Sequence, residues 1–451
     1  MKDIISTITM KELEQMTFRI LQECFSQVIR EILLEFDSII AETRDKKRFY
    51  LKDKRPLKFE SVYGSIELER NYYQDRETGE YVFLLDQYLN FDGTKGLSPV
   101  VQELAIELAV TGVSYRQAGQ ALEKLLGYPV ISHEGIRQQL LNTEVVPEKD
   151  VVPLQQDVLF VEVDGLYTKR QRNKRKGKEE KIAAVHQGWE VENNRAKLVG
   201  KRHYVHQGTH PFWEGFETFL METYAYDPTK HHLVINGDGA SWITACRDYF
   251  RHNVTFVIDR FHVARDIRAI FRDHPRCRDI QKKHAAYDAE GLLLELNSAV
   301  GTLGDEKKEE YLEKLINQLS QYPEGLRDYR ERLQEKGIAT EGFRPMGSAE
   351  GTMSVFAKRL KQGRSWSDNG LDKFIHVFVA IKDKLAIKIL NGKWTSTVET
   401  EGEQRQETQP PKHFVETLKD CAQEATRGNI AYLQQAIGKP IVAALKGLQG
   451  V

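Results

Sequence analysis

Three short apolar runs, each holding or followed by an aspartate, narrow the possible folds of this 451-residue chain most strongly. They are VLFVEVDG at 158–165, HHLVINGDG at 231–239 and VTFVID at 254–259, and segments of helical pattern separate the second and third. Strand patterns also occur between the first two runs, at 181–191 and 196–206. Short apolar runs bounded by glycine or charge are typical of buried strands, and strand–helix–strand order is typical of a layered α/β sheet. We therefore predict such a sheet, with helices on its faces, over residues 151–263.

Two of these runs place an aspartate where a metal ion could bind. Asp164 lies inside an otherwise apolar strand, where a carboxylate is costly unless a cation or hydrogen bonds offset its desolvation. Asp238 closes the second run between two glycines, which let the backbone turn sharply. Ligands collect at the carboxyl ends of strands in open α/β sheets, and Mg²⁺ prefers hard oxygen ligands. We predict that Asp164 and Asp238 share divalent cations, the alternatives being a structural carboxylate and a turn aspartate.

A third carboxylate usually completes a pair of metal ions that acts on a phosphodiester. The candidate is Glu350, in the first turn of a helix that small residues introduce in the sequence GSAEGTMS. A glutamate there also suits the helix dipole, so an ordinary first-turn residue is the alternative. Glu341 is the nearest rival. Glu162 is another, because it lies two residues before Asp164 and therefore on the same face of the strand.

Asp259 and His262 follow the third apolar run in the sequence DRFH. In the simpler interpretation, Asp259 caps the following helix and His262 is a partly buried histidine. In the functional interpretation, the end of this strand is close to the metal site and the pair orients DNA or the metal ligands.

The distribution of charge, rather than its total, allows a nucleic-acid partner. The net charge is -1, from 65 basic and 66 acidic residues, which is not the balance of a typical nucleic-acid binder. Residues 168–181, however, carry eight Lys or Arg against two Glu, and 358–364 reads KRLKQGR. Such local patches set phosphate contacts, although a solvated loop is the alternative for either run. The candidate DNA contacts are Lys174, Arg175, Lys176, Lys358, Arg359, Lys361, Arg364 and Trp366.

The N-terminal third has a different pattern. Residues 10–48 carry apolar positions at helical spacing, and 55–73 alternates as a small hairpin does. Residues 97–144 contain three short helical pieces separated by glycine turns, with serines as N-caps. This pattern predicts a helix-turn-helix module, with a three-helix packing domain as the alternative. Its last helix offers three side chains to DNA bases or phosphates, namely Arg137, Gln138 and Gln139.

Nothing in the sequence indicates export or membrane insertion. No run of 18 apolar residues occurs, and the first residues lack the basic and apolar regions of a signal peptide. The four cysteines are Cys24, Cys246, Cys277 and Cys421, too far apart for a zinc motif or a disulfide framework. We expect a cytoplasmic protein, associated with the nucleoid when bound to DNA.

Five motifs in a fixed order carry a family resemblance: VEVDGLY, LVINGDGASW, VIDRFHV, GSAEGTMS and GRSWSDNG. In this order they resemble the bacterial insertion-sequence transposases of the ISLre type, distant relatives of the Mutator-like DDE transposases. The resemblance implies an α/β RNase H-like catalytic core, a mixed sheet flanked by helices, interrupted by an all-α insertion. It also implies an N-terminal, mostly helical DNA-binding region. The implied catalytic and metal-binding carboxylates are Asp164, Asp238 and Glu350, and Asp259 with His262 is similar to the D/C-x-x-H element of Mutator-like enzymes.

The function implied is metal-dependent cleavage at transposon ends followed by strand transfer into target DNA. Mg²⁺ is the expected cofactor, with Mn²⁺ able to substitute, and double-stranded DNA is the expected partner of a homodimer or higher oligomer. Two alternatives remain open: a catalytically inactive DNA-binding or regulatory protein, and an RNase H-like nuclease that cleaves without joining.

The patterns divide the chain into six parts. The helix and hairpin (1–96) precede the helix-turn-helix-like region (97–150), and the first part of the core (151–263) precedes the all-α insertion (264–344). The end of the core (345–391) is followed by a polar linker and C-terminal helix (392–451).

Overall fold

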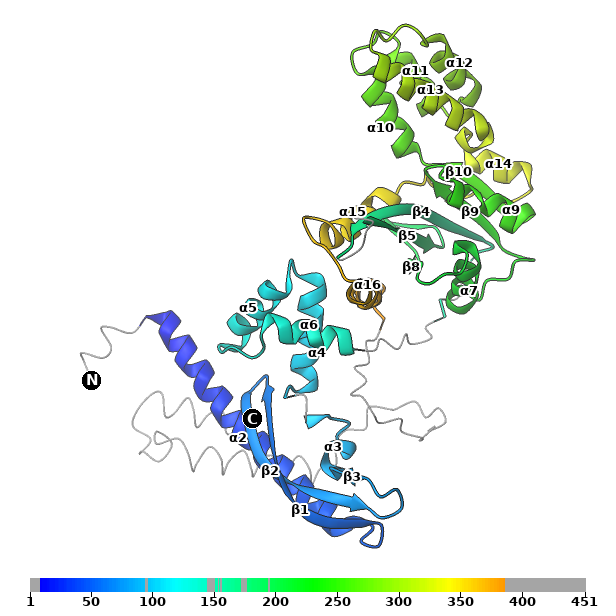
Figure 1. The fold of residues 1–451 in the computed structure, drawn as a ribbon. Helices are drawn as coiled ribbons and strands as arrows, with labels where there is room; N and C mark the ends of the chain where they lie inside the picture. Colours follow the sequence, from blue (N-terminus) through cyan, green and yellow to red (C-terminus); the bar gives the residue numbers. More distant parts are fainter. Residues whose placement is uncertain are drawn as a thin grey trace. The chain divides into compact units, whose positions relative to one another are not determined.

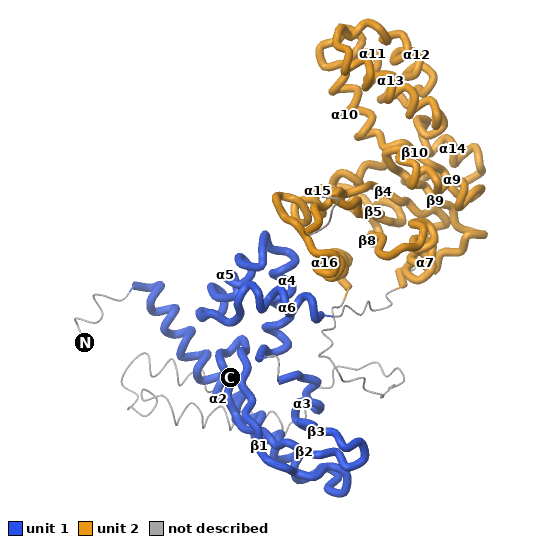
Figure 2. Tube along the Cα trace, in the orientation of Figure 1, with its two compact units in different colours: residues 1–144, 388–451 blue, residues 145–387 orange. Residues whose placement is uncertain are grey.

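The computed structural model describes residues 9–93, 96–143, 151–152, 154, 156–171, 177–193 and 195–385. The chain separates into two compact units, residues 1–144 with 388–451 and residues 145–387 (Figure 2). Two parts of the sequence-based prediction lie outside the described residues. They are the linker and helix at 392–451, and the basic residues Lys174, Arg175 and Lys176.

The first unit opens with the predicted long helix and hairpin (Figure 1). Helix α2 (Met10–Thr43) begins at a capping box formed by Thr9 and Glu12. It packs on β2 (Gly64–Asp75), which pairs antiparallel with β1 (Phe49–Ser61). The hairpin turns at the Tyr63-Gly64 step that the sequence indicates, and Gly64 has a φ of 109°. The short strand β3 (Tyr81–Val82) is the third strand of this sheet, and the short helix α3 (Leu84–Tyr88) packs on it.

The three predicted short helices follow in the same unit. They are α4 (Pro99–Thr111), α5 (Tyr115–Leu126) and α6 (His133–Asn142). Each begins at a serine whose side chain accepts a backbone hydrogen bond, namely Ser98, Ser114 and Ser132. Residues such as Val101, Leu122 and Ile136 form their common core. The three-helix prediction is confirmed as secondary structure.

The second unit is built on a mixed five-stranded sheet in the order β10-β9-β4-β5-β8. Its strands are β4 (Val158–Lys169), β5 (Gly177–His186), β8 (Arg202–Val205), β9 (His232–Gly237) and β10 (Val254–Ile258). The first three pair antiparallel, whereas β4, β9 and β10 are parallel to one another. The predicted mixed sheet flanked by helices is thus confirmed.

The two strand patterns after β4 break up more than the sequence predicts. The first one divides into β5 and β6 (Trp189–Glu192), and the second into β7 (Arg195–Leu198) and β8. Strands β6 and β7 pair as a separate two-stranded ribbon. The breaks fall at Gly188 and Gly200, whose φ angles are 121° and 59°. Glycine adopts such angles without a steric penalty, so the chain leaves the sheet and returns to it there.

Helices cover both faces of this sheet. Alternate residues of β4 point to opposite faces, so this one strand contributes to two separate cores. Leu159, Val161 and Val163 join one core with α7 (Phe212–Tyr224), α8 (Ser241–Thr244), α9 (Cys246–Phe250) and the insertion. Val158 and Phe160 join another, with α14 (Tyr329–Glu335). The last two described helices are α15 (Ala349–Leu360), which contacts β4, and α16 (Asp368–Lys382), which contacts β8.

The insertion between β10 and α14 is helical, as predicted. It consists of α10 (Arg260–Phe271), α11 (Cys277–Ala285), α12 (Ala289–Ser298) and α13 (Glu306–Gln321) (Figure 1). Leu292, Leu296 and Leu312 bury it against the sheet core. None of the helices described for this chain is both long and apolar enough to cross a membrane.

Candidate functional site

Three aspartates stand at one level of the sheet: Asp238 and Asp259 directly after two parallel strands, and Asp164 within β4, just beyond the part of that strand that pairs with β9. Glu162 in β4 is paired with Asn236 in β9, and Gly237 with Ile258 in β10. Asp238 directly follows β9 and Asp259 directly follows β10. Extending the pairing by one or two residues therefore brings Asp164, Asp238 and Asp259 side by side. The sheet therefore places these three aspartates at neighbouring positions along its predicted edge.

The Asp164 carboxylate is partly buried and carries a raised pKa. Burial raises its pKa, and the negative charges of Asp238 and Asp259 raise it further. The Gly165 N–H, 2.7 Å from Oδ1, and the charge of His262 act in the opposite direction. A carboxylate that burial and like charges both disfavour would be stabilised by a divalent cation. The donor chemistry of this edge therefore fits a hard metal ion such as Mg²⁺.

Asp238 sits in a tight turn that only small residues permit. Its Oδ1 accepts a hydrogen bond from the Ala240 N–H at 2.9 Å, so it is also the turn aspartate of the alternative interpretation. Gly239 has a φ of 88°. A Cβ on Gly237 would lie 2.6 Å from the Ile243 side chain, so this glycine lets α8 approach the strand end. Only Gly239 therefore provides the predicted turn, Gly237 instead permits the packing of α8, and the Asp238 carboxylate stays partly exposed.

Asp259 combines both roles that the sequence leaves open. Its Oδ1 caps α10 by accepting hydrogen bonds from the Phe261 and His262 N–H groups, at 2.7 and 3.2 Å. Its Oδ2 lies 3.6 Å from His262 Nδ1. Burial favours a higher pKa for Asp259, but the contacts with His262 outweigh it and hold the pKa below its usual value. Asp259 raises the pKa of His262, and Asp164 adds to that effect, so the histidine is electrostatically part of this site.

Asn236 is a site residue that the sequence interpretation missed. Its Nδ2 donates to Asp259 Oδ2 at 3.2 Å, and its side chain is buried. A polar residue two positions before Asp238 in an apolar strand is the signal that could have identified it, since such residues share a strand face.

Glu162 is engaged by the start of α15 instead of being free for a metal. Its carboxylate accepts hydrogen bonds from the Ser348 and Ala349 N–H groups, at 2.9 and 2.5 Å, and is 1% exposed. His186 Nε2 lies 3.8 Å from Oε1. Burial alone would raise the pKa of Glu162, but His186 and the Ser348 contacts together hold it below the usual value. Glu162 therefore ties α15 to β4, two residues from Asp164.

Glu350 lies in the first turn of α15, as predicted, and is exposed. Its rival Glu341 is exposed in a turn. In the part of the chain that the structure describes, no three His, Cys, Asp or Glu side chains are grouped closely enough to hold a metal ion. The structure thus brings Asp164 and Asp238 together but does not add Glu350 to them as a ready-made ligand set. The three-carboxylate set stays a prediction.

The basic stretch after Glu350 divides into exposed and buried cations. Lys358 and Lys361 are exposed. Arg359 is buried beneath the Phe374 ring, 4.8 Å from its centroid. Arg364 Nη1 donates to the Lys358 and Lys361 carbonyls, closing the end of α15. Of the DNA contacts predicted here, the two lysines present their charges freely.

Trp366 is also buried, and it attaches the end of this stretch to the tip of the β4–β5 hairpin. Its Nε1 donates to the Leu360 carbonyl at 2.9 Å. Its backbone N–H donates to Lys169, and the Gln171 N–H donates back to Trp366. A packing role, rather than contact with DNA, is what the structure assigns to Trp366. These bonds hold the two basic runs, far apart in sequence, next to each other.

The three candidate DNA-contacting residues of α6 already have partners within the first unit. Arg137 forms an exposed ion pair with Glu134 at 2.7 Å, and Gln138 Nε2 donates to the same carboxylate. Gln139 accepts a hydrogen bond from Gln102 in α4 at 2.6 Å. Arg137 and Gln138 lie on the outer side of α6, where a ligand could compete with Glu134. Gln139 instead joins two helices of the bundle.

The fold and site define an α/β protein with three aspartates at one level of its parallel strands and a helical insertion after the third of those strands. The chain belongs to the family described as "Uncharacterised protein family (UPF0236)", whose model matches residues 4–396. The match covers both compact units, so the family relationship includes the helical N-terminal region as well as the sheet.

Relatives of the same family occur in bacteria. A UPF0236 protein of Caldanaerobacter subterraneus subsp. tengcongensis is 26% identical over 356 residues, which are 76% of this chain and 72% of the relative. The name of that relative combines eleven locus numbers. A UPF0236 protein of Streptococcus gallolyticus, named for the vanSb 3′ region, is 25% identical over 83% of this chain and 84% of its own length.

Proposed function

We propose that this chain is a DDE transposase that cleaves DNA at the ends of a mobile element and joins them to target DNA. The observation that carries the proposal is the alignment of Asp164 and Asp238 on adjacent parallel strands. A partly buried carboxylate with a raised pKa, as Asp164 has, is typical of a catalytic site when it lies at the ligand-binding edge of an α/β sheet.

The sheet supports an RNase H-like core. Three antiparallel strands come first in the chain, and two further strands follow, parallel to the first and each preceded by helix. This is the strand–helix order expected for that core from the sequence. An all-α insertion between the last strand and the helix that carries Glu350 agrees with the order of elements implied by the ISLre-type resemblance.

The roles of the residues follow from their positions. Asp164 and Asp238 would hold a divalent cation, and Glu350 would complete the ligand set after a movement of the first turn of α15. With such a cation bound, the site would supply a Lewis acid and an activated water to phosphodiester chemistry. Asp259, fixed by Asn236 and by α10, holds His262 beside Asp164 and would help to orient the carboxylate or the DNA.

Two further observations favour DNA as the substrate. The exposed cations Lys358 and Lys361 lie at the end of α15, next to the hairpin that carries the other basic run. A single protein name that covers eleven loci of one organism is expected of a sequence that has been copied within a genome, as a mobile element is.

A cleavage and joining assay tests the proposal. The full chain is incubated with Mg²⁺ or Mn²⁺ and labelled DNA that carries the ends of its own genomic element, beside a target plasmid. We expect cut ends with 3′-hydroxyls and joined products, both abolished by Asp164→Asn. Cutting without joining would instead indicate a nuclease. DNA binding without any cutting, in both metals, would indicate a regulatory protein, and either result would overturn the transposase proposal.

A further inference from the structure

A cleft that is separate from the carboxylates of the sheet lies in the helical insertion, where α10 and α11 pack side by side. A cleft of about 480 Å³ opens between them, lined by Arg268, Ala269, Arg272, Cys277 and Gln281. None of these residues belongs to the carboxylate cluster at the ends of the strands. The cleft therefore has a chemistry of its own, set by two arginines and an amide.

The two arginines are available to bind a negatively charged ligand. Arg268 and Arg272 are four residues apart on α10, so both project from the same face of the helix. Both are exposed, and no carboxylate of the described residues forms an ion pair with either. Neighbouring arginines differ: Arg265 pairs with Asp266 at 3.2 Å, and Arg276 with Glu295 at 3.1 Å. The cleft thus holds two guanidinium groups that form no ion pair with a carboxylate of the described residues.

The start of α11 adds a second, independent source of positive potential. This nine-residue helix begins at Cys277, which lines the cleft. Its N-cap residue, Arg276, makes no side-chain capping hydrogen bond, and the Cys277 N–H donates to the His274 carbonyl at 3.0 Å. The positive end of the helix dipole favours an anion.

The surrounding charge favours a polyanion over a small acidic metabolite. Residues 260–288 carry eight Lys or Arg and four Asp. The acidic residue in the first turn of α11, Asp279, lies 3.8 Å from Lys282, which offsets its charge. This segment thus has an excess of four basic residues, which suits a ligand with repeated phosphates.

We propose that the Arg268–Arg272 cleft binds a backbone phosphate of duplex DNA, so that the insertion holds DNA outside the catalytic carboxylates. The inference deepens the proposed function, on which its choice of DNA rests. Two guanidinium groups bind phosphate oxygens directionally, and Gln281 adds an amide donor. Such a contact is independent of base sequence. It would therefore position DNA without selecting it.

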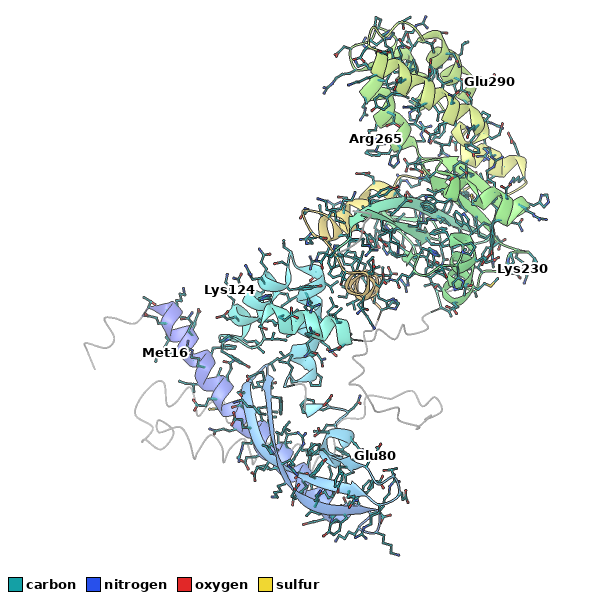
Figure 3. All side chains as sticks on the ribbon, in the orientation of Figure 1. Met16, Glu80, Lys124, Lys230, Arg265 and Glu290 are labelled. Atoms are coloured by element: carbon teal, nitrogen blue, oxygen red, sulfur yellow. The ribbon has the colours of Figure 1, made fainter. Side chains whose placement is uncertain are left out.

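The first test compares two double variants of equal charge. Arg268→Ala with Arg272→Ala removes the cleft arginines, whereas Arg265→Ala with Arg278→Ala removes exposed arginines of the same two helices that do not line it (Figure 3 labels Arg265). Duplex affinity of the full chain is measured by fluorescence anisotropy across a salt series, without divalent metal. We expect the cleft variant to lose about tenfold in affinity at low salt and to flatten the salt slope by about 1–2, with the control close to wild type. Equal effects of the two doubles would overturn the proposal.

The second test uses Cys277 as a reporter within the cleft. The thiol is partly exposed and unpaired. Its alkylation rate, read by mass spectrometry with the buried Cys246 as an unreactive reference, should fall at least about threefold when duplex DNA saturates the chain. Protection by inorganic phosphate alone, with none by DNA, would assign the cleft to a free anion. Protection by duplex RNA but not DNA would assign it to another nucleic acid, and either result overturns the proposal.

The outcomes also separate this inference from the proposed function. A wild-type chain that binds DNA through the cleft yet never cleaves it would overturn the transposase proposal and leave this one standing. If the wild-type chain cleaves and joins DNA, but the cleft and control variants bind DNA with equal affinity, the transposase proposal stands and the cleft proposal is overturned. Circular dichroism of both double variants checks that their folds match that of the wild type.

Discussion

The Glu162 carboxylate in β4 accepts a hydrogen bond at 2.9 Å from the backbone N–H of Ser348, which lies 186 residues further along the chain. The neighbouring N–H of Ala349 binds the other carboxylate oxygen. Together these bonds cap α15 with a residue from another element. They place the first turn of that helix, and with it Glu350, over the strand that carries Asp164.

Replacing Glu162 with glutamine tests this anchor. The amide keeps the size of the side chain but presents only one acceptor oxygen, so one N–H at the start of α15 loses its partner. An unsatisfied buried donor costs about 1–3 kcal/mol, and we expect the unfolding free energy of the metal-free chain to fall by that amount. Urea denaturation followed by tryptophan fluorescence measures the change.

The matched control for this prediction is Glu341→Gln, at an exposed turn position. It should leave the unfolding free energy within about 0.5 kcal/mol of the wild type. If Glu162 were a metal ligand instead, its substitution would weaken Mg²⁺ dependence of cleavage without destabilising the metal-free chain. That result would contradict the anchoring role.

Asp164→Asn should separate activity from stability. We expect cleavage to fall by about 1000-fold or more, as when a member of a catalytic set is lost. The metal-free chain should become more stable, because burial and the charges of Asp238 and Asp259, which raise the pKa of Asp164, no longer oppose a charged group. Thermal unfolding in EDTA measures the stability, and unchanged DNA affinity serves as the control. A destabilised variant would identify Asp164 as a structural carboxylate.

The strands and the two aspartates could be predicted because their signals are local. Apolar runs that contain Asp-Gly predict β4 and β9, a terminal glycine predicts the end of α4, and serine caps predict the starts of α5 and α6. Parallel pairing of β4 with β9 then follows from the order of the elements, and the register brings Asp164 level with Asp238.

What could not be predicted depends on contacts between distant residues. Glu162 resembles a metal ligand in sequence, and only the position of α15 shows that its oxygens are taken. Arg359 and Trp366 look like a basic, aromatic DNA contact, yet packing against Phe374 buries both. Whether a polar residue faces solvent or another helix is decided by tertiary structure, which periodicity alone cannot supply.

Asp86 should make the stability of the first unit depend on pH. It forms a buried ion pair with Arg70 at 3.0 Å. Burial raises the pKa of Asp86 to about 6, although Arg70 opposes the shift. Because the folded chain holds this proton more tightly than the unfolded chain, the contribution is largest below pH 4. It is lost as the pH rises from about 4 to about 6.

The expected loss of unfolding free energy over that interval is up to about 3 kcal/mol, for a shift of about two pKa units. Urea denaturation of the full chain at pH 4.5 and pH 6.5, followed by circular dichroism, gives the difference. In Asp86→Asn this part of the pH dependence should vanish, even though the variant is less stable overall because Arg70 loses its partner. An unchanged pH slope in the variant would show that another group is responsible.

Glu134 should act as an internal competitor for DNA at α6. Its carboxylate holds Arg137 through two guanidinium nitrogens and also accepts from Gln138, contacts that lower the pKa of Glu134 to about 2. It is therefore charged throughout the physiological range. Glu134→Gln removes a negative charge from the outer side of the helix and frees Arg137, so we expect about threefold to tenfold tighter binding to DNA carrying the element ends.

Arg137→Ala should weaken binding by a similar factor, and the double variant should resemble Arg137→Ala, because Glu134 acts through Arg137. Anisotropy titrations at two salt concentrations measure all three. If neither single variant changes affinity, α6 does not face DNA, and α4, α5 and α6 form a packing domain instead of a helix-turn-helix module.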